Sequence, residues 1–314
     1  MKQKKEKPHK YKTAAPLPAR RKCGTMAVHS RLLEQDPAFG RRLVDLERLT
    51  SRRMLAGLTH RAAAPTVISV VVHVIYNSAS ENISDAQIRS QIKRLNTDYS
   101  AKNPDRKKTP SVWGGLVTDA RIQFALATKG PDGKATKGIT RTKTAKTSFT
   151  DDDGVKSAAK GGADPWRSKE YLNLWVCSLG GGLLGYAQFP GGPAKTDGVV
   201  ILNTAFGTKG TATAPFNLGR TATHEVGHWL NLHHIWGDTQ HCEGTDFIND
   251  TPNARLPNYG KPKFPHISCS NGPNGDMFMN YMDYVDDDAM LMFTAQQVAR
   301  MNAALAGPRS GVGR

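Results

Sequence analysis

The stretch THEVGHWLNLHH, residues 223–234, decides how this chain folds. His224 and His228 are four residues apart, so on a helix their imidazoles lie one turn apart on the same face. Two imidazoles in this arrangement bind one metal ion, and Glu225 beside them is placed to act as a general base toward a water molecule. The stretch therefore predicts a helix that carries a zinc site suited to hydrolysis.

A catalytic zinc site usually has three protein ligands and one open position, so a third ligand is needed. His234 lies six residues after His228, which is the spacing of the extended pattern H-E-x-x-H-x-x-G-x-x-H. The chain must leave the helix near Asn231, where the pattern has Gly; Asn is the residue that next best tolerates a positive φ. Glu243 and Asp238 remain open as alternative third ligands, although neither stands in a supporting motif.

Basic residues are concentrated near the N-terminus. Residues 1–62 contain 16 of the 43 Lys and Arg and 5 of the 27 Asp and Glu, and so carry +11 of the net charge of +16. Such a segment could bind a polyanion, but no aromatic residues are interleaved with the lysines, and we expect a leader that binds no specific nucleic acid. The start MKQKK suits a signal peptide, but no apolar segment follows it. No run of residues approaches the 18 apolar positions of a membrane span.

Strand-like and helix-like patterns alternate after residue 65. Residues 66–76 are rich in Val and Ile and predict a buried first strand, and Ser84 opens a helix that runs to about residue 99. The polar residues 129–165 are expected to form a long surface loop. Further strands are expected at 122–127, 171–177 and 198–202, a Gly-rich edge segment at 180–190, and further helices at about 31–55, from about 218 and at 295–305.

A second motif lies downstream of the histidines. The sequence NYMDY, residues 280–284, resembles the Met-turn of the metzincins, in which Met282 would form an apolar floor beneath the imidazoles. With this motif, the chain resembles the pappalysin family of metzincin zinc metallopeptidases over most of residues 65–306, and strongly from about 170 onward. The other segments that resemble this family are GRTAT at 219–223, IWGD at 235–238 and DTP at 250–252.

The resemblance implies a fold and a division of the chain. The fold is α/β (α+β), with a twisted mixed five-stranded sheet, an active-site helix and an irregular C-terminal subdomain. Residues 1–62 would be a pro-segment, residues 63–234 the N-terminal catalytic subdomain, and residues 235–314 the C-terminal catalytic subdomain with the Met-turn.

The resemblance also implies roles for single residues. Tyr284 matches a tyrosine that donates a hydrogen bond to the developing oxyanion. Asp287 matches an acidic residue in the pocket for the residue after the scissile bond, where a carboxylate favours Arg or Lys. Gly185, Tyr186 and Ala187 correspond to the edge strand along which an extended peptide substrate binds.

The cysteines match the family at three positions. Cys242 and Cys269 correspond to a family disulfide, which would stabilise the fold by roughly 3–4 kcal/mol. Cys23, in the sequence RKCGT, resembles the cysteine of family pro-segments, whose thiolate occupies the open zinc position until the leader is removed. A free Cys23, or a disulfide between Cys23 and Cys177, is the alternative.

Three aspartates follow the zinc motif in an irregular segment. Asp238, Asp246 and Asp250 offer hard oxygen ligands that suit Ca²⁺. Pappalysins bind calcium in this region, so the resemblance implies that these residues are calcium ligands. The alternative is that they are solvated carboxylates in turns.

These features together predict a zinc-dependent metalloendopeptidase. We expect it to be secreted, to be made as a latent zymogen, and to hydrolyse protein or peptide substrates before Arg or Lys. A competing hypothesis is a basic binding protein with a structural zinc site. A structural site usually has a fourth Cys or His ligand, and the sequence offers only Cys23 of the leader for that place.

Overall fold

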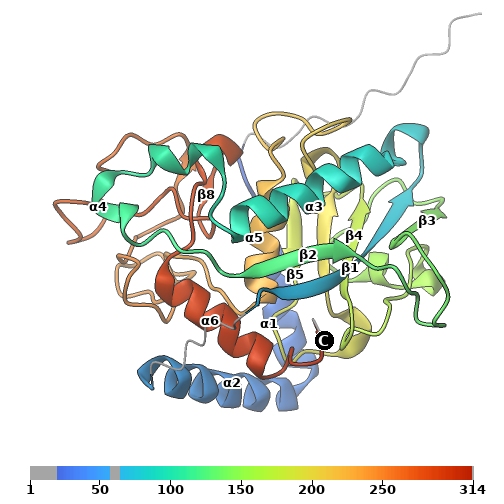
Figure 1. The fold of residues 1–314 in the computed structure, drawn as a ribbon, viewed down its shortest axis with the longest axis horizontal. Coiled ribbons are helices and arrows are strands. Elements are labelled where there is room, and N and C mark those ends of the chain that lie inside the picture. Colours follow the sequence, from blue (N-terminus) through green and yellow to red (C-terminus); the bar gives the residue numbers. More distant parts are fainter. Residues whose placement is uncertain (1–19, 57–63, 313–314) are drawn as a thin grey trace, which may run out of the picture.

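A six-stranded sheet forms the centre of the computed structural model, which describes residues 20–56 and 64–312 (Figure 1). The strand order is β2-β1-β4-β6-β5, and β3 also pairs with β1. All pairs are parallel except β5 with β6, so the sheet is mixed as predicted. The strands are β1 (Thr66–Tyr76), β2 (Ile122–Leu126), β3 (Ile139–Lys143), β4 (Leu172–Cys177), β5 (Gly185–Ala187) and β6 (Val199–Leu202).

Strand β3 corrects two predictions, because the sequence predicted five strands and a surface loop over residues 129–165. Its sequence, ITRTK, is polar, and none of its residues is fully buried. The first half of β1 pairs with β2, and the second half, residues 72–76, pairs with β3. The long, apolar β1 therefore decides the place of β3. Val155 and Lys156 in the same predicted loop are also buried.

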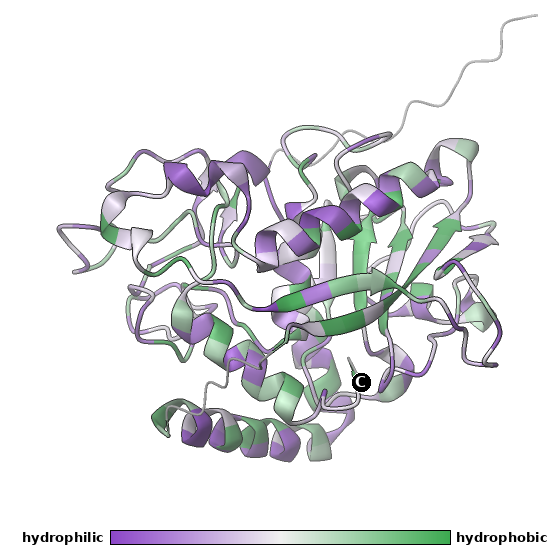
Figure 2. Ribbon diagram, in the orientation of Figure 1, coloured by the Kyte–Doolittle hydropathy of each residue, from purple (hydrophilic) through white to green (hydrophobic). Residues whose placement is uncertain are grey.

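Helices α3 (Asp85–Tyr99) and α5 (Arg220–Trp229) pack against each other and position the histidine motif. The Ser84 side chain caps α3 by accepting a hydrogen bond from the Gln87 amide, as the sequence predicts for a helix start. Helix α5 also packs against β5 and β6, and all of its residues are buried. Figure 2 shows that the strands beneath these helices are strongly hydrophobic, which accounts for the position of the core.

Residues 20–56, which belong to the predicted pro-segment and are called the leader below, form two helices, α1 (Thr25–Gln35) and α2 (Pro37–Leu55), instead of the single helix predicted at 31–55. The Asp36 side chain accepts a hydrogen bond from the Ala38 amide, and Pro37 occupies the first turn of α2, so the sequence Asp-Pro starts a new helix. Helix α1 packs on β5, and α2 packs beside α6 (Ala295–Ala306) (Figure 1). The predicted boundary at residue 62 lies outside the described residues.

The segment between α5 and α6 is largely irregular, as predicted, although the proposed division at residue 234 stays a prediction. Its strands, β7 (Tyr259–Gly260) and β8 (Tyr284–Val285), pair only with each other. Among the described residues, no helix has the length and apolar character needed to cross a membrane. The remaining short elements are α4 (Ser111–Gly114) and 3-10 turns at Ala79–Glu81, Pro104–Lys108, Gly154–Lys156, Ala158–Lys160, Ala194–Thr196, Asn203–Ala205 and Asp287–Ala289.

Candidate active site

The three predicted metal ligands lie together and are buried. The Nε2 atom of His228 is 3.1 Å from Nε2 of His224 and 3.0 Å from Nε2 of His234, and the remaining pair is 3.3 Å apart. Three nitrogens bound at about 2.05 Å to a tetrahedral zinc ion are expected to be about 3.3 Å apart. The three imidazoles therefore fit a zinc ion. Cys23 lies beside the three histidines, since one ligand atom from each of the four residues lies within 4.8 Å of the others. These four residues are called the metal group below.

The turn after α5 brings His234 back to the other two histidines. Helix α5 ends at Trp229, and Asn231 has a φ of 76°, as predicted for the place where the family pattern has Gly. The amide of Leu232 then donates to the carbonyl oxygen of Gly227 at 2.9 Å, which closes the turn.

Each imidazole has a second partner that fixes its orientation. Nδ1 of His224 lies 2.7 Å from the carbonyl oxygen of Tyr281, and Nδ1 of His228 lies 2.7 Å from that of Leu232. Nδ1 of His234 lies 2.5 Å from Oδ1 of Asp238. Because these acceptors hold the proton on Nδ1, each Nε2 is left with a lone pair for a metal. Burial and the neighbouring histidine lower the pKa of His224 and of His228, which keeps both in the neutral, metal-binding form.

Glu225 is buried beside the histidines. Its Oε2 accepts hydrogen bonds from the Thr25 hydroxyl at 2.9 Å and from the Cys23 thiol at 3.3 Å, both of which belong to the leader. Burial raises the pKa of Glu225 to about 7, although these hydrogen bonds oppose the shift. A carboxyl group with such a pKa is suited to general acid and base catalysis near neutral pH.

Met282 and Tyr284 lie against the metal ligands from the irregular segment. A Cβ atom at Gly227 would be 2.6 Å from Sδ of Met282, so only glycine allows this contact. The Tyr284 ring packs at 4.9 Å from the ring of His234 and 5.7 Å from that of His224. Burial raises the pKa of Tyr284, which keeps its hydroxyl protonated and able to donate.

The leader pairs with β5, the strand predicted to bind substrate. The amide of Gly24 donates to the carbonyl oxygen of Gly185 at 2.9 Å, and the amide of Ala187 donates to the Thr25 hydroxyl at 2.8 Å. The bridge between Cys23 and Gly185 is parallel. Gly185 and Ala187, two of the three residues predicted to contact a peptide, therefore already bind the leader, and Tyr186 between them is buried.

Arg21 of the leader binds Asp287, the predicted specificity residue. Nη2 of Arg21 lies 2.6 Å from Oδ1 of Asp287, and Nη1 donates to the Thr221 hydroxyl at 3.0 Å. Nε donates to the carbonyl oxygen of Val285 at 3.3 Å, and the guanidinium lies 5.1 Å from the centre of the Phe216 ring. Asp287 is fully buried, and its Oδ1 atom is bound by the Arg21 guanidinium.

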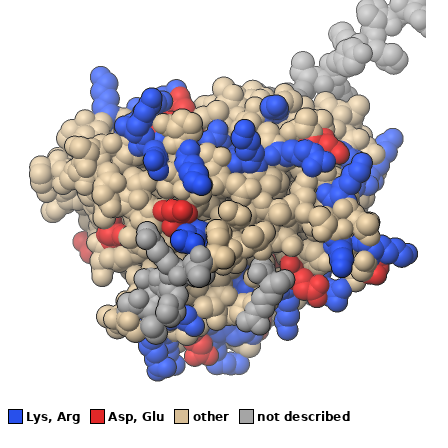
Figure 3. Space-filling view, viewed as in Figure 1, with Lys and Arg blue, Asp and Glu red and all other residues tan. Residues whose placement is uncertain are grey.

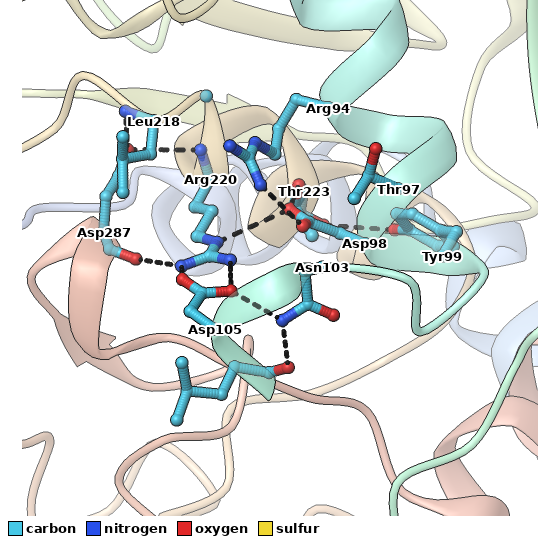
Figure 4. Close-up of polar contacts among 12 residues, drawn as sticks. Arg94, Thr97, Asp98, Tyr99, Asn103, Asp105, Leu218, Arg220, Thr223 and Asp287 are labelled. Carbon is cyan, nitrogen blue, oxygen red and sulfur yellow. Dashed lines mark hydrogen bonds and ion pairs between the residues drawn. The ribbon is translucent and has the colours of Figure 1, made fainter. Parts of the chain in front are cut away.

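A buried network holds Asp287 at the start of α5 (Figure 4). Oδ2 of Asp287 accepts from the amides of Leu218 and Arg220, at 2.8 and 3.3 Å. The Arg220 guanidinium donates to the Asp287 carbonyl oxygen at 2.7 Å and to both carboxylate oxygens of Asp105, at 2.7 and 2.8 Å. Its Nε also lies 3.6 Å from Oδ2 of Asp98. The network leaves Oδ1 of Asp287 directed at the Arg21 side chain.

Known proteins share this arrangement. Residues 156–306 match the family model Peptidase_M43, described as pregnancy-associated plasma protein-A. An extracellular metalloprotease of Pyricularia oryzae is 34% identical over 266 residues, which are 81% of this chain and 80% of that protein. The chain belongs to the pappalysin family.

Solved structures agree with this membership in the pappalysins. A Tannerella forsythia promirolysin mutant, E225A, has a TM-score of 0.85 and 44% identity over 93% of this chain and 97% of that one. Mature mirolysin in complex with a cleaved peptide has a TM-score of 0.78 and 49% identity, over 80% of this chain and 97% of that one. The fold is therefore that of a metzincin, and the chain is a metalloendopeptidase of a family that implies zinc.

The calcium prediction finds no support in this pappalysin. Asp238 contacts His234, and Asp246 accepts hydrogen bonds from the Ile248 amide and the Thr251 hydroxyl. Asp250 accepts from the Thr294 hydroxyl and the Gln296 amide at the start of α6. Within the described ranges, only the group formed by Cys23 and the three histidines brings three or more His, Cys, Asp or Glu ligand atoms together.

The other cysteine predictions are settled by the structure. Cys242 and Cys269 form the predicted disulfide, while Cys23 and Cys177 are both free, which excludes a bond between them. Glu243, an alternative third ligand, is exposed and does not belong to the metal group.

A basic surface lies away from these residues. Figure 3 shows Lys and Arg side chains across the upper part of one face, in the region of α3. Arg89, Lys93 and Lys102 line a groove of about 790 Å³ there. Asn96 in the groove bonds both the amide and the carbonyl oxygen of Phe124, so its side chain takes the place of a further strand beside β2. No predicted site residue lines this groove.

Three contributions of the leader are missing from the sequence predictions. Arg21, Thr25 and Glu47 all contact the catalytic part of the chain through buried or half-buried polar groups. Only Arg21 carries a usable sequence signal, since it is a basic residue two positions before Cys23, and an acidic pocket was predicted near the metal. The other two contacts depend on how the leader folds.

Proposed function

We propose that this chain is the latent form of a secreted zinc-dependent metalloendopeptidase, and that removal of the leader gives an enzyme that cleaves before Arg or Lys. The observation that carries the proposal is that three imidazole nitrogens, the Glu225 carboxylate and the Cys23 thiol meet at one buried point. Relatives named extracellular metalloproteases support secretion, and a disulfide is suited to an oxidising compartment.

The proposed mechanism assigns one task to each group. His224, His228 and His234 would hold zinc, which when bound lowers the pKa of a water molecule to about 7 and polarises the scissile carbonyl. Glu225 would take the proton of the attacking water and deliver it to the leaving amine, a task for which a carboxylate beside the three histidines is placed. Tyr284 would donate a hydrogen bond to the developing oxyanion.

Cys23 accounts for the proposed latency. Its thiol lies among the imidazoles, where the attacking water would lie, and it also bonds to Glu225. The leader therefore covers the metal position, the base and the β5 edge at once. The likeness to the promirolysin structure extends over 93% of this chain, against 80% for the mature form, which supports the presence of a pro-segment here.

The Arg21 contacts support the proposed specificity and refine it. Three different nitrogens of Arg21 donate to Asp287, Thr221 and the Val285 carbonyl oxygen. A lysine ammonium has one nitrogen and cannot reach all three acceptors, since they surround a planar fork. We therefore expect the enzyme to prefer Arg to Lys after the scissile bond.

The proposal is tested with three matched peptides that carry Arg, Lys or Gln after the scissile bond. We expect cleavage by the proteolytically processed chain, sensitive to a zinc chelator, in the order Arg, Lys, Gln. Replacing Asp287 by Asn should lower the advantage of Arg over Gln by about 100-fold, because a buried carboxylate is lost.

Asp288→Asn is the matched control, because the neighbouring Asp288 is in an exposed pair with Lys261. It should keep the preference for Arg. Equal cleavage of the three peptides would contradict the specificity, and the absence of cleavage by zinc-loaded, processed protein would contradict the peptidase function itself.

A further inference from the structure

A second, partly buried ion pair joins the leader to the catalytic part of the chain, apart from the metal group. Nη1 of Arg300 on α6 donates to Oε2 of Glu47 on α2 at 2.7 Å, and Nη2 donates to Oε1. The side-chain nitrogen Nδ2 of Asn231 also donates to Oε1 of Glu47, at 3.2 Å. The side chain of Arg300 is 1% exposed and that of Glu47 is 29% exposed.

The catalytic part of the chain also contacts the Arg300 side chain. Nε of Arg300 donates to the carbonyl oxygen of Asn231 at 2.6 Å, and the guanidinium lies 5.3 Å from the centre of the Phe247 ring. Asn231 is fixed by the positive-φ turn that returns the chain to His234. The two terminal nitrogens of the planar Arg300 guanidinium, with the side-chain amide of Asn231 beside them, are arranged to bind a carboxylate. The leader contributes only the carboxylate of Glu47.

We propose that Arg300 and Asn231 form a carboxylate-binding site that anchors the leader independently of the metal group. Helix α2 packs on α6, and its residues Leu46 and Thr50, next to Glu47 in the chain or one turn from it, are buried. Loss of the carboxylate would leave a buried, unpaired guanidinium, which costs more than loss of an exposed pair. Release of Cys23 from the metal group therefore leaves α2 docked.

The inference rests on the proposed function only in treating residues 20–56 as a removable leader. Its test is amide hydrogen exchange of the full chain, which requires no peptidase activity. For Glu47→Gln, we expect the exchange of the α2 amides to be at least about tenfold faster, because the buried guanidinium loses its charged partner.

Two further variants make the result specific. Asp45→Asn removes the same charge from α2, but Asp45 and its partner Arg48 are 74% and 70% exposed, so exchange should change by less than about twofold. Cys23→Ser should leave the exchange of α2 equally unchanged. The amides of β1 serve as the internal control for an intact fold.

Two results would overturn the proposal. One is an α2 exchange rate in Glu47→Gln equal to that of the parent chain, which would show that the carboxylate anchors nothing. The other is a Cys23→Ser variant whose α2 exchanges as fast as in Glu47→Gln, which would show that the anchor depends on the metal group.

Discussion

Residues 64–234 and residues 235–312 are stabilised in different ways. The first part is built on a sheet in which backbone groups of six strands pair with each other. The second part has two strands of two residues each, and its chain is fixed by a disulfide and by side chains that bond to backbone groups. Asp250 and Thr294 are examples, since each binds a backbone amide at the start of α6.

This difference matches a difference in function. The sheet part contributes the helix with His224, Glu225 and His228, whereas the irregular part contributes groups that support it, such as the Tyr281 carbonyl oxygen and Met282. The regular scaffold positions Glu225 and two of the histidines, and the irregular segment packs against them.

Arg220 joins the two parts, so its loss should have the largest effect on stability. Arg220→Met leaves Asp105 without its cation and the buried Asp98 with the partly exposed Arg94 as its cation, and we expect the free energy of unfolding to fall by about 3–5 kcal/mol. Urea unfolding measures the effect. Arg94→Met is the control, since Arg94 is partly exposed and 3.4 Å from Asp98. Equal losses for the two variants would show that the network in Figure 4 contributes no more to the free energy of unfolding than the partly exposed Arg94 pair.

The disulfide should stabilise the irregular part only. Replacing Cys242 and Cys269 by Ser opens a loop with a sequence separation of 27, and we expect a loss of roughly 3–4 kcal/mol. Hydrogen exchange should become faster in residues 235–312 and stay slow in β1 and β4. Equally fast exchange in the sheet would contradict the separation of the two parts.

The two parts should respond to pH in opposite directions. Burial lowers the pKa of His73 in β1 to about 4, so the unfolded chain binds more protons between pH 4 and 6.5, and stability rises with pH there. The expected size is about 3 kcal/mol. Burial raises the pKa of Asp246 in the irregular part to about 7, so the folded chain binds more protons between pH 3.8 and 7, and stability falls with pH.

The two contributions oppose each other between pH 4 and 6.5, so each is obtained from the difference between a variant and the parent chain in urea unfolding at a series of pH values. Relative to the parent, the stability of His73→Gln should fall as the pH rises from 4 to 6.5, and that of Asp246→Asn should rise between pH 3.8 and 7. If His73→Gln left the slope of the parent chain unchanged, another group would be responsible for it.

The smallest effect is expected at the start of α6. The Thr294 hydroxyl accepts a hydrogen bond from the Gln297 amide and donates to Asp250. Thr294→Ala should lower the free energy of unfolding by about 1 kcal/mol, the usual value of a helix cap. Thr97→Ala on the exposed side of α3 is the control and should cost less, because Thr97 bonds only within its own helix.

The sheet was largely predictable because buried strands have apolar, β-branched sequences. The prediction for β1 at 66–76 is confirmed at both ends, and β2 and β4 begin or end within one residue of their predicted limits. Strand β3 was missed because its sequence is polar and its pairing is decided by β1, 67 residues away at His73 and Thr140.

The three histidines of the metal group were predictable because they are close in sequence, and the positive φ of Asn231 agrees with the expected turn. The contacts of the leader were harder to predict. Its break at Asp36-Pro37 follows a recognisable helix-start signal, but the pairing of Glu47 with Arg300 spans 253 residues and depends on how α2 docks. The calcium prediction lost its support because a cluster of aspartates in sequence need not converge in space.

The most direct test of the account is the zinc content and peptidase activity of Glu225→Ala, measured after removal of the leader beside Glu243→Ala. We expect Glu225→Ala to keep about one zinc per chain and to lose activity by at least about 100-fold, because the ligands remain and the base is gone. Glu243→Ala should keep both zinc and activity. Near-parent activity of Glu225→Ala, or loss of zinc from Glu243→Ala, would contradict the account.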